Sequence, residues 1–146
     1  MSHVVDMQCE VKDLDCLAKA AKRIGLELVK DQKHYKWYGE SVGDYPLPAG
    51  FTEADLGNCD HALRIPGDHD AYEIGVVKRK DGRPGFTLIW DFFAQEKTLI
   101  PRVGQDGGLL KQAYAREVAR KQLIREGYRV TETTDEQGTV HLAFVE

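Results

Sequence analysis

Apolar and polar residues alternate over residues 4–11, which is the first clear pattern in the chain. The largely apolar set of positions consists of Val5, Met7, Cys9 and Val11. A period of two predicts a β-strand with one buried face. Helical spacing follows, and Asp13 is expected to cap a helix that Gly25 ends. Its apolar positions are Leu14, Leu17, Ala18, Ala21 and Ile24.

The middle of the chain predicts four strands and one long loop. The segment "KHYKWYG", residues 33–39, is short and aromatic as strands are, so we expect the second strand there. Residues 40–58 contain prolines and glycines without a sustained period, which indicates a long loop with one helical turn over 52–57. The runs "HALRI", "AYEIGVVKR" and "FTLIWDFF" are separated by turn-forming residues and predict an antiparallel meander.

The C-terminal part predicts a helix and then a hairpin. The helix is expected over residues 109–126 and Gly127 is placed to end it. Glu117 and Lys121 interrupt its apolar stripe, which consists of Leu110, Tyr114, Val118 and Ile124. The segments "YRVTET" and "TVHLAFVE" flank the turn "DEQG" and predict a terminal β-hairpin.

These elements together indicate an α+β fold. We expect a mostly antiparallel sheet with two helices packed on one face, in the order β-α-β-β-β-β-α-β-β and similar to the ferredoxin-like arrangement. The 146 residues are enough for one hydrophobic core, so we expect a single domain over 1–146 with a loop insertion at 40–58.

Composition narrows the class of protein. The formal net charge of −4 argues against a protein that holds nucleic acid by bulk attraction. The three cysteines form no Cys-x-x-Cys pair, which argues against a disulfide framework. We find no signal-peptide pattern and no apolar run long enough for a membrane helix, so we expect a cytoplasmic protein that does not bind membranes.

Several of these segments together resemble a known family. They are the opening "MSH", the helix "DLDCLAKAAKRIGLEL", the strand "YEIGV" and the closing "YAREVARKQLIREGYRV" with its hairpin. The chain resembles the hypothetical chloroplast reading frame thirty-five family, which has plastid, cyanobacterial, bacterial and phage members. The resemblance implies no catalytic residues, because the family has no established activity. It implies a protein partner, an AAA-type ATPase, from gene neighbourhood, and a bacterial or phage type, because the plastid form lacks most of the 40–58 loop.

The densest group of polar side chains lies in "GNCDHALRIPGDHDAYEIG", residues 57–75. A metal site would need Cys59 and His61 to meet His69 and either Asp68 or Asp70. On a hairpin the two groups lie about 13 Å apart, because a strand rises about 3.3 Å per residue. We therefore expect turn residues at 68–70 and no bound metal or cofactor. Cys59 and His61 remain candidates for a nucleophile and its base.

Two further groups of residues are candidate sites. Asp91 and Glu73 could act as acid and base if neighbouring strands bring them together. Cations and aromatic side chains typical of nucleic-acid or phosphate binding occur in two segments, at Lys36, Trp37, Arg116 and Arg120. The simpler interpretation of the first segment is that Trp37 is part of the core and that Lys36 is solvated.

The first functional hypothesis is a non-enzymatic accessory or adaptor protein that binds a protein partner. The long loop carries apolar residues that a partner could bury, namely Tyr45, Leu47, Phe51 and Leu56. Self-association through an open sheet edge would give a homo-oligomer. The alternatives are a nucleotide- or RNA-binding module and a Cys/His-dependent or metal-dependent enzyme.

Overall fold

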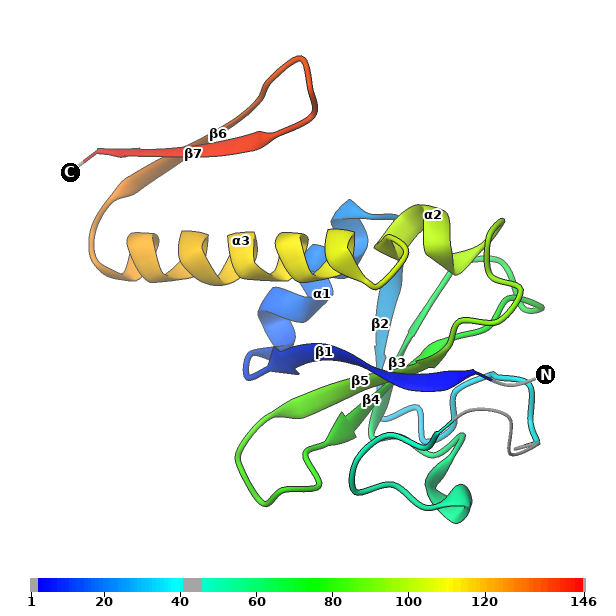
Figure 1. Ribbon diagram of the computed structural model, residues 1–146. Helices are drawn as coiled ribbons and strands as arrows, with labels where there is room; N and C mark the ends of the chain where they lie inside the picture. Colours follow the sequence, from blue (N-terminus) through cyan, green and yellow to red (C-terminus); the bar gives the residue numbers. More distant parts are fainter. Residues whose placement is uncertain (1–2, 41–45, 146) are drawn as a thin grey trace.

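The computed structural model describes residues 3–40 and 46–145, and these residues form two sheets and three α-helices (Figure 1). The elements of the first half are β1 (Val4–Val11), α1 (Leu14–Arg23), β2 (Glu27–Lys30), a 3₁₀ turn η1 (Glu53–Asp55), β3 (His61–Arg64) and β4 (Ile74–Lys78). The second half contains β5 (Phe86–Asp91), α2 (Leu99–Val103), α3 (Gly108–Arg125), β6 (Arg129–Thr134) and β7 (Val140–Val145). Among residues 3–40 and 46–145, no helix is long and apolar enough to cross a membrane.

The main sheet has the strand order β1-β5-β4-β3-β2, and every neighbouring pair is antiparallel. The α+β class and the meander are therefore confirmed. The ferredoxin-like order is not confirmed, because α1 carries the chain from β1 at one edge to β2 at the other. Three strands then lie between β1 and β2, and the meander returns one strand at a time until β5 pairs with β1.

All three α-helices border one face of the main sheet. Asp13 caps α1 as predicted, because its Oδ1 accepts from the backbone N–H of Cys16 at 3.1 Å. The alternating apolar residues of β1 pack on this helix-covered face, together with side chains from the meander and the helices. The fully buried members include Val11, Leu17, Leu63, Ile74, Val76, Leu88, Leu99, Val103 and Leu110. The short helix α2 was not predicted, because its five residues are too few to show a helical period and include Pro101.

Ion pairs join α1 to α3 at the two positions that interrupt the apolar stripe of α3. Glu117 is buried and accepts from Nε of Arg23 at 2.5 Å. Lys121 Nζ lies 2.5 Å from Oδ2 of Asp13. Both charges therefore face α1, which supplies a partner of opposite sign for each.

The opposite face of the main sheet is covered by residues 31–40 and 46–60, which we call the covering segment. Tyr35, Leu56 and Cys59 from this segment are buried against side chains of the sheet, including Ala62, Val77 and Ile89. The prediction of a strand over 33–39 was wrong: β2 occupies the edge beside β3, and in "KHYKWYG" only His34 makes a single bridge, to Asn58. This segment instead crosses the back of the sheet.

The predicted terminal hairpin is confirmed, but it forms a separate two-stranded sheet. Figure 1 shows this hairpin beyond α3, on the side away from the main sheet. It is joined to the rest of the molecule through β6, whose Glu132 Oε2 lies 2.6 Å from Nη1 of Arg23.

The packing of Tyr35 on Gly75 gives a first prediction. A Cβ atom at position 75 would lie 2.5 Å from Cδ1 of Tyr35. Gly75→Ala should therefore lower the free energy of unfolding by about 1–3 kcal/mol, the usual cost of overpacking. Urea denaturation measures the change. In a Tyr35→Ala variant, which lacks the ring, Gly75→Ala should lower the free energy of unfolding much less. An equal decrease in the presence and absence of the Tyr35 ring would contradict this packing.

The pairing of Asp13 gives a prediction about pH. The hydrogen bond from Lys121, together with that from the Cys16 backbone, lowers the pKa of Asp13 from 3.8 to about 2. A lowered folded-state pKa stabilises the fold above the unfolded pKa, and this contribution is lost as the pH falls toward 2. The difference in the free energy of unfolding between the native chain and Asp13→Asn should therefore be largest above about pH 4. It should decrease between about pH 4 and 2. Urea titrations at several pH values test this. The control is Asp15→Asn, since Asp15 is an exposed acid of the same helix. A gap that does not vary with pH would contradict the prediction.

Candidate functional site

The structure separates Cys59 from His61. The Cys59 thiol points into the core beneath the covering segment and donates to the carbonyl of Gln32 at 3.1 Å. The His61 ring lies against Phe86, whose side chain packs with the helix-covered core, and its Nδ1 accepts from the backbone N–H of Asp31 at 2.9 Å. The two side chains therefore have different partners on different faces of the sheet, and they do not form a nucleophile and base.

The polar residues of the turn after β3 shape the backbone. Oδ1 of Asp68 accepts from the backbone N–H groups of Asp70 and Ala71, both at 3.1 Å, as expected of a turn-forming aspartate. His69 is exposed. Within residues 3–40 and 46–145, no group of three or more His, Cys, Asp or Glu side chains is placed to hold a metal ion.

The carboxylates of Asp91 and Glu73 hold the backbone of the covering segment. Asp91 is fully buried and accepts from the backbone N–H groups of His3, Phe93 and Tyr38 at 2.9–3.1 Å. Glu73 Oε1 accepts from the backbone N–H of Lys36 at 2.9 Å, and the Glu73 N–H donates to the Lys36 carbonyl. These bonds replace the strand ladder that "KHYKWYG" does not form. Both carboxylates therefore have structural partners, and the structure places them as anchors of this segment.

The loop residues expected to bind a partner do not form one exposed surface. Leu56 is buried on the sheet, and Phe51 is half-buried, with Lys80 Nζ 5.2 Å from the centre of its ring. Leu47 is exposed. Tyr45 lies outside the described residues. The prediction was wrong for Leu56, because the sheet has an apolar second face that needs a cover.

The four candidates for nucleic-acid binding lie on two separate elements. Lys36 Nζ donates to the His69 carbonyl at 2.7 Å, and Trp37 is half-buried among the side chains under the covering segment. A Cβ atom on Gly57 would lie 2.5 Å from Nε1 of Trp37, which shows how closely the indole packs. Arg116 and Arg120 lie on α3, beyond the opposite face of the sheet. The structure does not bring the two pairs together.

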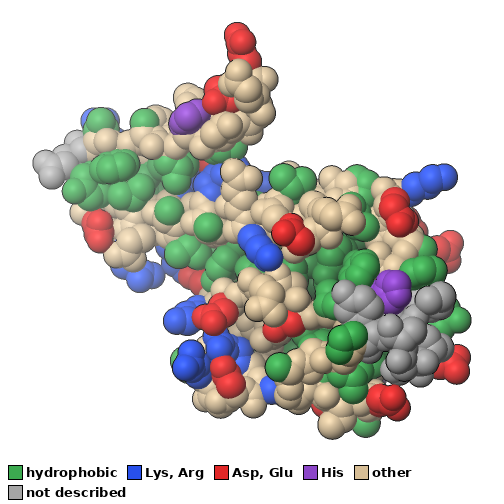
Figure 2. Space-filling view, in the orientation of Figure 1, with side chains coloured by type: hydrophobic (Ala, Val, Ile, Leu, Met, Phe, Trp, Pro, Cys, Tyr) green, Lys and Arg blue, Asp and Glu red, His purple; other side chains and the backbone are tan. Residues whose placement is uncertain are grey.

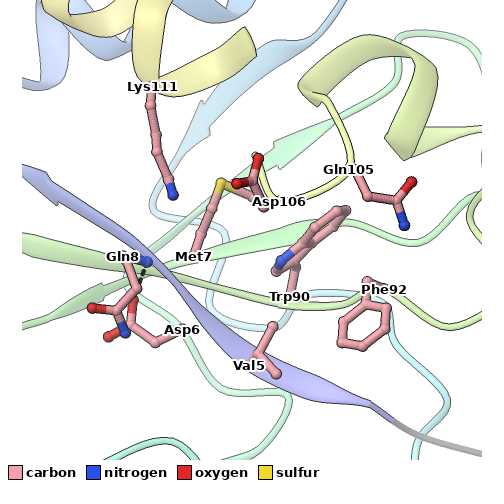
Figure 3. A pocket seen from close by; sticks show the side chains of 9 residues that line it. All are labelled: Val5, Asp6, Met7, Gln8, Trp90, Phe92, Gln105, Asp106 and Lys111. Carbon is pink, nitrogen blue, oxygen red and sulfur yellow. Dashed lines mark hydrogen bonds between the residues drawn. The ribbon is translucent and has the colours of Figure 1, made fainter. Parts of the chain in front are cut away.

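A pocket of about 440 Å³ opens between β1 and the start of α3. Figure 3 shows Met7, Trp90 and Phe92 along its wall, with Lys111 extending into it from α3. Asp6 and Asp106 also line it, but the first accepts from the backbone N–H of Gln8 and the second from that of Gly108. Its lining contains no His, Cys or Ser that could act as a nucleophile or base. The arrangement suits binding better than proton transfer.

Exposed apolar side chains gather at the C-terminal end of the described chain. We call this the C-terminal surface; its members are 40–57% exposed and are Val118, Ile124, Phe144 and Val145. Figure 2 shows hydrophobic side chains at the end of the molecule where α3 meets the hairpin. The Tyr128 ring packs edge-on against Phe144 at 5.2 Å between centroids. The alternation of "TVHLAFVE" places Phe144 and Val145 on opposite faces of the strand. Both are exposed, and among the described strands β7 pairs with β6 alone.

A surface groove of about 500 Å³ runs between side chains of α1 and α3 and was not predicted. We call it the basic groove; it is lined by Lys19, Lys22, Arg23, Glu117 and Arg120. The sequence contained one sign of it, since Lys19, Lys22 and Arg23 lie on the polar side of the first helix. Only the packing of the two helices brings them beside the ridge formed by Arg116 and Arg120.

Comparisons of the chain with protein-family models, curated proteins and solved structures found no match.

The environment of Cys59 gives a prediction about its reactivity. Burial raises the pKa of Cys59 to about 12, so the reactive thiolate is scarce at pH 8. Iodoacetamide should therefore modify Cys59 in the native chain at least about a hundredfold more slowly than in the urea-unfolded chain. Mass spectrometry of the alkylated peptides measures both rates. Rapid modification of native Cys59 would show that its thiol is accessible and ionised, and would restore it as a candidate nucleophile.

Proposed function

We propose that this protein is a non-enzymatic accessory or adaptor protein that binds a protein partner through its C-terminal surface. The observation that carries the proposal is the gathering of Val118, Ile124, Phe144 and Val145 on α3 and the hairpin. Large apolar side chains that are exposed near one another at one end of a molecule are typical of interaction sites. The proposal moves the interface from the loop at 40–58, because two of its four candidate residues, Phe51 and Leu56, pack against the sheet.

The hairpin provides a second argument. A two-stranded hairpin is at best marginally stable in water by itself. Here β7 pairs with β6 alone among the described strands, and its sequence "VHLAFV" contains no Lys, Arg, Asp, Glu or Pro. An edge strand without charges or proline favours pairing with another chain. A partner that covers the hairpin would stabilise it and bury Phe144 and Val145.

The family resemblance implies an AAA-type ATPase as this partner, and we propose that class. A second copy of the chain could use the same open edge, so self-association is the alternative occupant of this surface. The nucleotide- or RNA-binding alternative has less support, because its four candidate residues lie on two separated elements. An enzymatic function also has less support, because Cys59, His61, Asp91 and Glu73 all have structural hydrogen-bond partners.

The double substitution Phe144→Asp/Val145→Asp tests the proposed interface. It places two charges on the exposed surface, so capture of the partner from host extract should fall at least about tenfold, the effect of losing about 1.4 kcal/mol of binding free energy. Quantitative mass spectrometry of the captured proteins measures the loss.

The matched control is Tyr38→Asp/Leu47→Asp, since these side chains are also exposed but lie outside the C-terminal surface. It should leave capture unchanged. Light scattering of the purified variants distinguishes a second copy from a different protein. Undiminished capture by the Phe144→Asp/Val145→Asp variant would contradict the proposed interface.

A further inference from the structure

We propose that the basic groove between α1 and α3 binds an acidic peptide segment of the partner. This inference deepens the proposed function, on which it rests, because it specifies the chemistry of that partner next to the C-terminal surface. The groove and the hairpin are neighbours, since Arg23 contacts Glu117 in the groove and Glu132 on β6.

The first argument is the charge of the groove. Its lining and its rim hold five cations against the carboxylates of Glu117 and Glu132; these cations are Lys19, Lys22, Arg23, Arg116 and Arg120. Both carboxylates already pair with Arg23. This excess of positive charge occurs in a chain whose formal net charge is −4. A local positive field attracts an anionic ligand.

The second argument is that most of these cations are unpaired. Within the described residues, no hydrogen bond or ion pair involves the side chains of Lys19, Lys22, Arg116 or Arg120. In contrast, the neighbouring Lys121 pairs with Asp13. The hydrogen bond from Arg23 lowers the pKa of Glu132, and the charges of Arg116 and Arg120 lower it further. The two arginines therefore lie close enough to β6 to act on a ligand bound there.

The third argument concerns the shape of the anion. Glu117 lies between the two helices, so a compact dianion such as a phosphate would meet a carboxylate at the centre of the groove. The free cations instead lie on two walls, Lys19 and Lys22 on α1 and Arg116 and Arg120 on α3. An extended segment with several carboxylates can contact both walls while its backbone passes over Glu117. None of the five lining residues is aromatic, so the groove lacks the stacking platform typical of single-stranded RNA binding.

Binding of a fluorescein-labelled peptide of about ten glutamates to the full chain, measured by anisotropy, tests the inference. We expect saturable binding that weakens as salt rises, because exposed charges are screened. Lys19→Glu/Lys22→Glu should weaken this binding at least about tenfold, whereas Lys19→Arg/Lys22→Arg should retain it. The matched control Lys33→Glu/Lys97→Glu changes the net charge equally at exposed lysines outside the groove and should have less than about a twofold effect.

Three results would overturn the inference. The first is a lack of saturable peptide binding, and the second is that the control variant weakens binding as much as the groove variant does. The third is that pyrophosphate or a short single-stranded RNA displaces the labelled peptide at lower concentrations than unlabelled peptide does. The hairpin variant Phe144→Asp/Val145→Asp should still bind the peptide. If only the peptide experiment fails, the C-terminal surface still stands as the proposed interface. If the hairpin variant captures the partner undiminished, that interface is contradicted and the groove stands as a separate anion site.

Discussion

The main sheet has apolar side chains on both faces, and both faces must be shielded from water. The helices shield one face, where Leu63, Leu88 and Trp90 are buried. Within the described residues, no α-helix lies over the other face, where Ala62 and Ile89 are fully buried. Residues 31–40 and 46–60 take the place of a second helical layer. Phe51 and Leu56 of the predicted loop therefore pack with the core.

This arrangement accounts for most residues that first suggested chemistry. A covering segment without regular structure needs partners for its backbone N–H groups, because an unpaired buried donor is costly. Asp91 and Glu73 each accept one such hydrogen bond, from Tyr38 and Lys36, and Gly57 provides a carbonyl for the N–H of Tyr35. Gly75 leaves room for the Tyr35 ring. Cys59 lies beneath the same segment as a small buried side chain.

The residues that remain available for a partner lie at the other side of the molecule. Arg23 joins α1, α3 and the hairpin by pairing with both Glu117 and Glu132. This contact joins the hairpin to both helices. Within the described residues, the side chains of Lys19, Lys22, Arg116 and Arg120 have no hydrogen-bond or ion-pair partner. An apolar surface beside a basic groove suits a partner that combines apolar and acidic residues, and electrostatic complementarity of this kind favours specificity and rapid association.

Local sequence pattern is enough to predict the elements whose periodicity reflects one buried face. The alternation of β1, the capped helix α1, the meander, α3 and the hairpin all follow from local pattern and turn chemistry, and the structure contains each of them. The role of "KHYKWYG" depends on long-range packing, because an aromatic segment can either pair at the edge of a sheet or cover its face. Here β2 occupies the sheet edge beside β3, so this segment covers the face. Tertiary structure also decided that Glu117 and Lys121 face α1, since a charge within an apolar stripe is stable only where another element supplies its partner. The candidate surfaces depend on the same long-range placement, because exposure and charge clustering are set by which helices and strands pack together.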